Sequence, residues 1–311
     1  MKRAVALAVA AGEIWAALTE DDTVVELRMA RGGVSSRVGE IWLGRVIALR
    51  PELPAVLVDI GLDRPAFLSA EDVVPKSRFK ALHEGEAVVV EIAKDARADK
   101  AAGVTMRLSH VVAPPTGARS PLRLDAALPP AAALVAAWLD PAPDAIAADD
   151  RAVYAELRNG LRAKYPALVE RLGFSNEPLY ERAGIGDAVE QALAPRLALP
   201  GGGFLLIEPT ALGVTVDVDS GGAQSLVAAN LAAARTLARQ IRLRNLAGPM
   251  MVGLVGMKGK GERERVLVAL KKALARHAPD CHVLGWTRLG HVELVRKRRA
   301  PSLAEILTKT V

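Results

Sequence analysis

An apolar run that ends in two aspartates constrains this chain more than any other feature. Residues 211–221 read ALGVTVDVDSG, in which valines alternate with polar residues as in a β-strand. Because successive side chains of a strand point to opposite faces, Asp217 and Asp219 share one face while Val216 and Val218 point into a core. Two carboxylates this close repel each other unless a cation lies beside them. The pattern indicates either a divalent metal site or a solvated acidic strand end.

Three segments in the second half of the chain resemble a known family. They read LPGGGFLLIEPTALGVTVDVDS at 199–220, NLAAARTLARQIRLRNL at 230–246 and RLGHVELVRKRRAPSL at 288–303. In this order and near this spacing, they resemble the catalytic region of the ribonuclease E/G family. The resemblance implies a metal-dependent endoribonuclease that cuts single-stranded RNA. Together with the spacing of the aspartate pair, it indicates Asp217 and Asp219 as the catalytic and metal-binding residues, with Mg²⁺ as the expected cofactor and Mn²⁺ as the alternative.

The same resemblance includes departures at the metal site. Alignment of residues 238–257 places the family's second metal-binding aspartate at Gly253 and its next acidic position at Gly256. The family has asparagine at the position of Asp219, and a family glutamate corresponds to Ala211. Relative to the family, this chain therefore lacks the carboxylate of the neighbouring strand, at Gly253, and has an additional one, Asp219, beside Asp217. We expect an endoribonuclease, with a catalytically inactive RNA-binding relative as the alternative.

The first half of the chain resembles a nucleic-acid-binding barrel. Residues 37–73 and 85–92 contain short runs of Val, Ile and Leu broken by Gly, Pro and Asp, which is typical of small β-barrels. These runs are similar to an S1 domain, which has the OB-fold. By that resemblance Phe67 stacks a base and Lys100 holds phosphate, whereas the family's second stacking aromatic is Leu57 here. A core position for Phe67 and a merely solvated Lys100 are the alternatives.

Charge also favours an RNA partner. The formal net charge is +6, and basic residues gather in the last third of the chain. Those at 263–276 alternate with apolar residues as on the solvent face of a helix, so we expect them to be solvated. Arg296 to Arg299 match the family's basic motif, and we expect Arg296 and Arg298 to bind RNA. The loop GMKGKGE at 256–262 fits either a phosphate cradle or an ordinary surface loop.

Other classes of protein are excluded or disfavoured. Cys281 is the only cysteine, which excludes disulfide frameworks and cysteine-rich zinc sites. Larger family members carry a zinc link after the PSL motif, so we expect no zinc-linked oligomer here, and a homodimer stays open. Residues 1–18 have the composition of a signal peptide, but Glu13 interrupts the apolar run early. With no other run of membrane-spanning length, we expect a cytoplasmic protein without a membrane partner.

These anchors predict an α/β (α+β) protein of several parts. We expect residues 37–110 to form the S1 barrel and residues 111–130 to form a Pro-rich linker. Residues 1–36 would form strands that pack on an RNase H-like remnant at 131–199, and residues 200–311 would form a DNase I-like mixed α/β domain. The family's 5′-end-sensing motif G-x-x-x-R-T-A is absent. No preference for 5′-monophosphate RNA is therefore predicted.

Overall fold

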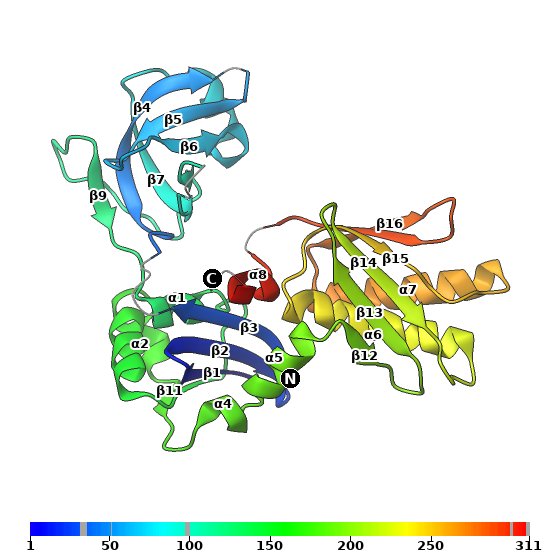
Figure 1. Ribbon diagram of the computed structural model, residues 1–311. Helices are drawn as coiled ribbons and strands as arrows, with labels where there is room; N and C mark the ends of the chain where they lie inside the picture. Colours follow the sequence, from blue (N-terminus) through cyan, green and yellow to red (C-terminus); the bar gives the residue numbers. More distant parts are fainter. Residues whose placement is uncertain (32–35, 51, 97–99, 299–300, 309–311) are drawn as a thin grey trace. The chain divides into compact units, whose positions relative to one another are not determined.

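The computed structural model describes all 311 residues except 32–35, 51, 97–99, 299–300 and 309–311. It divides into two compact units (Figure 1). The first contains residues 1–31 together with residues 134–311, and the second contains residues 32–133. The second unit is therefore an insertion between two segments of the first, and each unit buries an apolar core of its own.

The second unit is built on a closed five-stranded barrel. Its strands pair in the order β5-β6-β8-β7-β4, and β4 also pairs with β5, which closes the barrel. Each of these pairs is antiparallel except β6 with β8. The elements are β4 (Ile41–Arg50), β5 (Ala55–Asp59), β6 (Ala66–Ser69), η1 (Ala70–Asp72), η2 (Lys76–Ala81), β7 (Ala87–Lys94) and β8 (Gly103–Thr105). The expectation of a mixed α/β protein with a barrel is confirmed.

Close packing inside the barrel explains one of its glycines. Val46, Val58 and Ile92 are fully buried in the barrel core. A Cβ atom at Gly44 on β4 would lie 2.5 Å from Val58 Cγ1 and 3.0 Å from the carbonyl oxygen of Asp59. Because the second of these neighbours is backbone, the barrel has no room for a side chain there.

A short strand lies within the segment that we expected to be a linker. Strand β9 (Leu122–Asp125) pairs antiparallel with the first residues of β4. His110 Nε2 lies 2.8 Å from Asp125 Oδ2, which fastens the end of β9 to the segment that follows β8. The Pro-rich composition did not indicate this strand, because four alternating residues are too few for a periodic signal.

The first unit contains a five-stranded sheet with the order β11-β10-β1-β2-β3. Strand β1 pairs antiparallel with β2 and parallel with β10, so residues from both sides of the inserted barrel meet in one sheet. Its strands are β1 (Arg3–Ala10), β2 (Glu13–Glu20), β3 (Thr23–Arg31), β10 (Ala145–Ala148) and β11 (Leu172–Phe174). The accompanying helices are α1 (Pro130–Ala136), α2 (Arg151–Lys164), α3 (Pro166–Val169), α4 (Leu179–Arg182) and α5 (Ile185–Leu193).

The first unit also contains a six-stranded mixed sheet with the order β12-β13-β14-β15-β17-β16. Strand β14 is parallel to β15, and α6 connects the two. The strands are β12 (Arg196–Ala198), β13 (Phe204–Pro209), β14 (Val214–Asp219), β15 (Gly248–Val252), β16 (Cys281–Trp286) and β17 (Val292–Arg296). The helices are α6 (Leu226–Leu243), α7 (Lys260–His277) and the short α8 (Leu303–Thr308).

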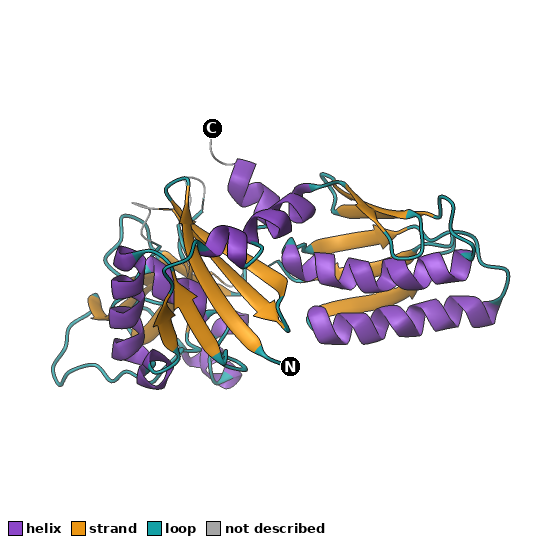
Figure 2. Cartoon of the chain, turned by 90° about the horizontal axis from the view of Figure 1, so that it is seen from below, coloured by secondary structure: helices purple, strands orange, loops and turns teal. Residues whose placement is uncertain are grey.

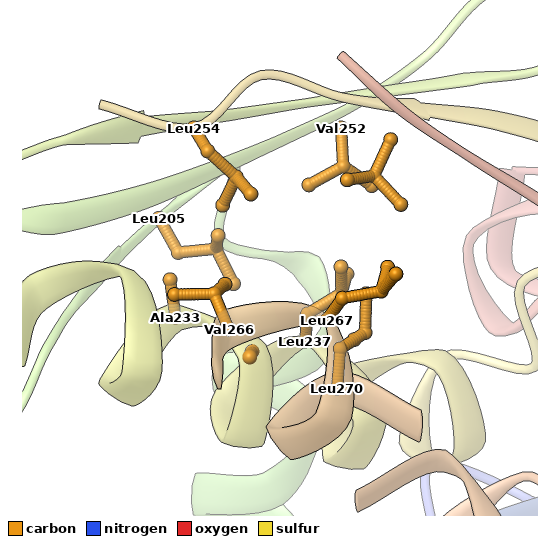
Figure 3. A pocket seen from close by; sticks show the side chains of 10 residues that line it. Leu205, Ala233, Leu237, Val252, Leu254, Val266, Leu267 and Leu270 are labelled. Atoms are coloured by element: carbon orange, nitrogen blue, oxygen red, sulfur yellow. The ribbon is translucent and has the colours of Figure 1, made fainter. Parts of the chain in front are cut away.

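Helices α6 and α7 lie side by side along one face of this sheet (Figure 2). The core between helices and sheet contains Leu205, Val216, Leu237 and Leu270. A void of about 10 Å³ remains in this core, and every residue that lines it is apolar (Figure 3). Because it has no polar lining and no more room than a single water needs, it is a packing gap and not a ligand site.

The C-terminal end of α6 joins the two sheets of the first unit. Arg242 donates hydrogen bonds to Glu20 at 2.9 Å and to Glu26 at 3.2 Å, both on the five-stranded sheet. Arg244 is buried and donates to the Gln240 side chain at 2.7 Å. Burial lowers the pKa of the Arg244 guanidinium to about 10. The RLRN segment at 242–245 is therefore a structural junction.

Among the residues that the structure describes, none of the helices combines the length and the apolar character that crossing a membrane requires.

Candidate active site

Strand β14 presents its two aspartates as the alternation predicts. Val214, Val216 and Val218 are buried on the side of the helices, whereas Asp217 and Asp219 are exposed on the opposite face. We call this opposite face of the six-stranded sheet the open face. The two carboxylates thus lie on one surface, at the end of a strand in the middle of the sheet.

Asp217 is free to act on a ligand. Its side chain is exposed, and it lies directly opposite Leu206 on the neighbouring strand β13. Within the part of the chain that the structure describes, the Asp217 carboxylate has neither a hydrogen bond nor an ion pair. It therefore keeps its full capacity to accept hydrogen bonds or to bind a cation.

Asp219 is already engaged by the protein. Its Oδ1 accepts a hydrogen bond of 2.8 Å from the backbone N–H of Gly221, which fixes the turn after β14. Its Oδ2 lies 3.9 Å from Nη2 of Arg196 on β12. Both oxygens thus have partners, and the arginine supplies the positive charge that the pattern of two aspartates requires.

Gly253 lies beside Asp217, directly after β15. Its N–H donates a hydrogen bond of 2.8 Å to the carbonyl oxygen of Val216. A Cβ atom at Gly253 would lie 2.8 Å from Asp217 Oδ1 and 3.7 Å from His291 Nδ1. A side chain at position 253 would therefore meet the carboxylate of Asp217, as the alignment with the family requires.

The sequence reasoning missed His291 and Asn230. His291 precedes β17 and faces the space beside Gly253, because Val292 pairs with Val252. Asn230 is fully buried on α6; its amide donates to the Val255 carbonyl at 2.9 Å and accepts from the Val255 N–H at 3.1 Å. It thereby holds the segment after β15. Both residues lie in segments that resemble the family, at 230–246 and 288–303, but no role could be assigned to either from the sequence, because only strand register and helix packing bring them here.

The side chains around Asp217 offer few ligands to a divalent metal. Among the described residues, no group of three or more His, Cys, Asp and Glu side chains is arranged to hold a metal ion. Asp219 has other partners, and Gly253 has no side chain. Magnesium usually keeps several waters and takes one or two protein carboxylates together with substrate phosphate. The residues therefore fit a metal that Asp217 shares with RNA and do not fit a metal held by the protein alone.

The two RNA-binding positions predicted in the barrel lie on neighbouring segments. Phe67 on β6 is 37% exposed, so it is not a core residue. Its N–H donates to the carbonyl oxygen of Ala102, two residues beyond the exposed Lys100. Leu57 pairs directly with Phe67 across β5 and β6, so the absent second aromatic would have stood beside the first. RNA binding by Phe67 and Lys100 stays a prediction.

The two basic positions of the C-terminal motif differ in their surroundings. The guanidinium of Arg296 donates to Asp280 Oδ1 at 2.9 Å, to Asn245 Oδ1 at 3.2 Å and to the carbonyl oxygen of Leu246 at 3.1 Å. Arg296 therefore anchors β17 to the end of α6. Arg298 is exposed and donates to Glu305 at 2.7 Å. Arg299 lies outside the described residues, and RNA binding by this motif stays a prediction.

The glycine and lysine loop at 256–262 leads into α7. The backbone N–H of Lys258 donates to the Glu262 carboxylate at 2.9 Å. An acidic side chain therefore already occupies a backbone donor that a phosphate would need. This contact favours the interpretation of an ordinary surface loop.

Comparison with known proteins agrees with these motifs. The sequence profile of the ribonuclease E/G family matches residues 93–299. Ribonuclease G of Haemophilus influenzae is 26% identical, and the matched region covers 94% of this chain and 78% of the relative. Ribonuclease G of Escherichia coli K12 is also 26% identical, over 90% of this chain and 76% of the relative. Ribonuclease E of a Nostoc species is 36% identical over 43% of this chain and 20% of the relative. Since the family profile covers well over half of its length, this chain belongs to the ribonuclease E/G family.

Proposed function

We propose that this protein is an endoribonuclease that binds single-stranded RNA and cuts it at the open face, with Asp217 at the cutting site. The observation that carries the proposal is the geometry of Asp217. In a chain of this family, its carboxylate is exposed and has no hydrogen bond or ion pair among the described residues, and its strand resembles the family's catalytic segment. Beside it lies Gly253, where an added Cβ atom would be 2.8 Å from Asp217 Oδ1 and 3.7 Å from His291 Nδ1, so a group bound there would contact both side chains.

Magnesium bound at this site would lower the pKa of a bound water and stabilise charge on the phosphate. The protein's own residues would hold and orient the RNA. Asp217 offers the carboxylate, and the buried Asn230 fixes the segment on which Gly253 lies. His291 faces the same space and can donate or accept a hydrogen bond from RNA or water.

The barrel supplies RNA binding in this proposal. We assign it as an S1-type OB-fold domain, on which Phe67 stacks a base and Lys100 contacts phosphate. The five-stranded sheet with its helices corresponds to the RNase H-like remnant, and the six-stranded sheet corresponds to the DNase I-like domain. A cytoplasmic location, and a homodimer without a zinc link, belong to the same proposal.

A second candidate is an RNA-binding protein that has lost cleavage. Two observations favour it: the absence of a side chain at Gly253, and the engagement of Asp219 by Arg196 and Gly221. Purified protein and a labelled unstructured RNA, incubated in Mg²⁺ and in EDTA, separate the two candidates. Magnesium-dependent cleavage supports the first, whereas binding without cleavage supports the second.

Asp217→Asn is expected to reduce magnesium-dependent cleavage by about 100-fold or more. Loss of an outer-shell partner of a metal ligand already costs about 10- to 100-fold, and Asp217 is the ligand itself. The rate of cleavage at fixed Mg²⁺ measures the effect. Glu208→Gln is the matched control, because Glu208 is an exposed carboxylate on the neighbouring strand β13. Unchanged cleavage in Asp217→Asn would contradict the assignment of this residue.

Phe67→Ala is expected to weaken binding of an unstructured oligonucleotide by about 1–3 kcal/mol, the usual value of stacking one base on an aromatic ring. Titration at several salt concentrations in EDTA measures this effect. The log–log dependence on salt should keep its slope, because that slope counts phosphate contacts at about 0.7 each on single strands. If Phe67→Ala keeps the wild-type affinity at low salt and only its salt dependence becomes flatter, Phe67 does not stack a base.

A further inference from the structure

Arg196 and Phe204 form a stacked pair next to Asp219. Arg196 lies on β12 and Phe204 begins β13. The guanidinium carbon of Arg196 is 3.5 Å from the centroid of the Phe204 ring. This short distance places the guanidinium against the ring, and its Nη2 lies 3.9 Å from Asp219 Oδ2. We call this pair the arginine platform.

Strand register places the arginine platform beside the proposed cutting site, because Phe204 lies directly opposite Asp219 on β14. Arg196 lies opposite Leu206 on β13, and Leu206 lies opposite Asp217 on β14. These three residues therefore form one row across the open face. Neighbouring strands are about 4.8 Å apart, so the row spans about 10 Å. The guanidinium of Arg196 leans from this row onto Phe204, so the arginine platform lies next to Asp219, two residues along β14 from Asp217.

The ion pair of the platform contributes little to stability. The side chains of Arg196 and Asp219 are 54% and 52% exposed. An ion pair this exposed contributes about 0–1 kcal/mol to the free energy of folding. The ring covers one face of the guanidinium, and the exposure of the side chain leaves the other to solvent. A flat cation with one free face is a surface on which nucleobases stack in RNA-binding proteins.

We propose that the free face of the Arg196 guanidinium, supported by Phe204, stacks a nucleobase of single-stranded RNA beside Asp217. This inference rests on the proposed function, because it names how the substrate of that site is held. Charge supports it. Two aspartates at one strand end repel a phosphate backbone. Arg196 offsets the charge of Asp219, which the proposed metal does not need.

Arg196→Lys tests the platform, because lysine keeps the positive charge but has no plane to stack on a base. Affinity for a fluorescently labelled unstructured oligoribonucleotide is measured by anisotropy in EDTA, so cleavage does not enter. We expect binding about tenfold weaker than for the wild-type protein, with an unchanged salt dependence. Phe204→Leu should weaken binding as well, since it removes the ring that supports the guanidinium. Thermal unfolding of both variants confirms that they fold.

Arg151→Lys is the matched control. Arg151 also stacks on an aromatic ring, with its guanidinium carbon 5.0 Å from the Phe174 centroid, but it lies on α2 beside the five-stranded sheet. Its replacement should leave RNA binding unchanged. Equal losses in Arg151→Lys and Arg196→Lys would overturn the assignment of a local platform.

The remaining outcomes separate the platform from the proposed function. Arg196→Lys that binds as wild type, in a protein that cleaves RNA in Mg²⁺, overturns the platform and leaves the function intact. A wild-type protein that does not cleave, with weakened binding in Arg196→Lys, supports the platform and overturns cleavage. Full affinity in Arg196→Lys with a flatter salt dependence in Arg196→Met would mean a phosphate contact in place of stacking. Failure of the wild-type protein to bind any single strand overturns both.

Discussion

Gly253→Asp is expected to tighten Mg²⁺ binding and to raise cleavage of unstructured RNA at least tenfold. A Cβ atom at this position lies 2.8 Å from Asp217 Oδ1, so the new carboxylate would stand beside the existing one. The close approach is to the end of an exposed side chain, which can turn aside, and the φ angle of Gly253 is not in the left-handed region. Two adjacent carboxylates repel each other until a divalent cation lies between them, so the added charge favours metal binding.

The measurement is cleavage rate against Mg²⁺ concentration, together with direct titration of the protein with Mn²⁺. Gly253→Asn is the matched control, because it has the same shape without the charge. Adding Asp219→Asn to Gly253→Asp recreates the family pattern and should keep the gain. If Gly253→Asp folds and neither binds Mn²⁺ more tightly nor cleaves faster, position 253 does not take part in metal binding.

Arg244→Met is expected to lower the free energy of unfolding of the first unit by at least about 3 kcal/mol. Arg244 Nη2 donates to the carbonyl oxygens of Gln191 at 3.0 Å and Ala194 at 2.7 Å, and its Nε donates to Gln240. Methionine fills the volume but leaves these buried acceptors without a donor. Hydrogen bonds to charged groups contribute about 1.5–3 kcal/mol each, and unpaired buried acceptors add their desolvation cost.

Urea unfolding followed by tryptophan fluorescence measures this loss. Trp15, Trp138 and Trp286 report on the first unit, and Trp42 reports on the barrel. A chain with two units need not unfold in one step, so the two transitions are fitted separately. Arg235→Met is the control on the same helix, because Arg235 is exposed, and it should change stability by less than about 0.5 kcal/mol. Equal losses in the two variants would show that the contacts of Arg244 contribute nothing specific.

Local periodicity predicted the parts of the site that depend on one strand alone. The alternation in β14 placed Asp217 and Asp219 on one face, and the structure agrees. The nearness of Gly253 to Asp217 could be expected only from the family resemblance. No periodicity within either segment indicates that β14 and β15 are parallel neighbours.

The partners of charged side chains were beyond the reach of sequence reasoning. Arg296 belongs to a basic run, which suggested RNA, yet its partners are Asp280 and the end of α6, some 50 residues earlier. Asp219 was predicted to bind metal because of its spacing from Asp217, yet Arg196 faces it from another strand. In both cases the residue type suggested a role, but the sequence did not reveal which residue contacts the side chain. That contact depends on how distant strands pair.

The motifs that identify the family turn out to be of two kinds. The segment around Asp217 faces solvent and can carry chemistry. The RLRN segment, by contrast, is filled with contacts inside the protein, since Arg242 and Arg244 join elements of the first unit. A chain can therefore keep the second kind of motif for its fold while the first kind changes.

The insertion of the barrel between β3 and β10 has a consequence for synthesis on the ribosome. The hydrogen bond from the Arg3 N–H to the Asp144 carboxylate joins residues 141 positions apart. At about 5–20 residues per second, β10 emerges roughly 7–30 s after β1. During this interval one edge of an apolar strand has no neighbour, and such an edge favours pairing with other chains. While the barrel is being made, β1 therefore lacks one of its two strand neighbours, and a chaperone that covers this edge would act in that window.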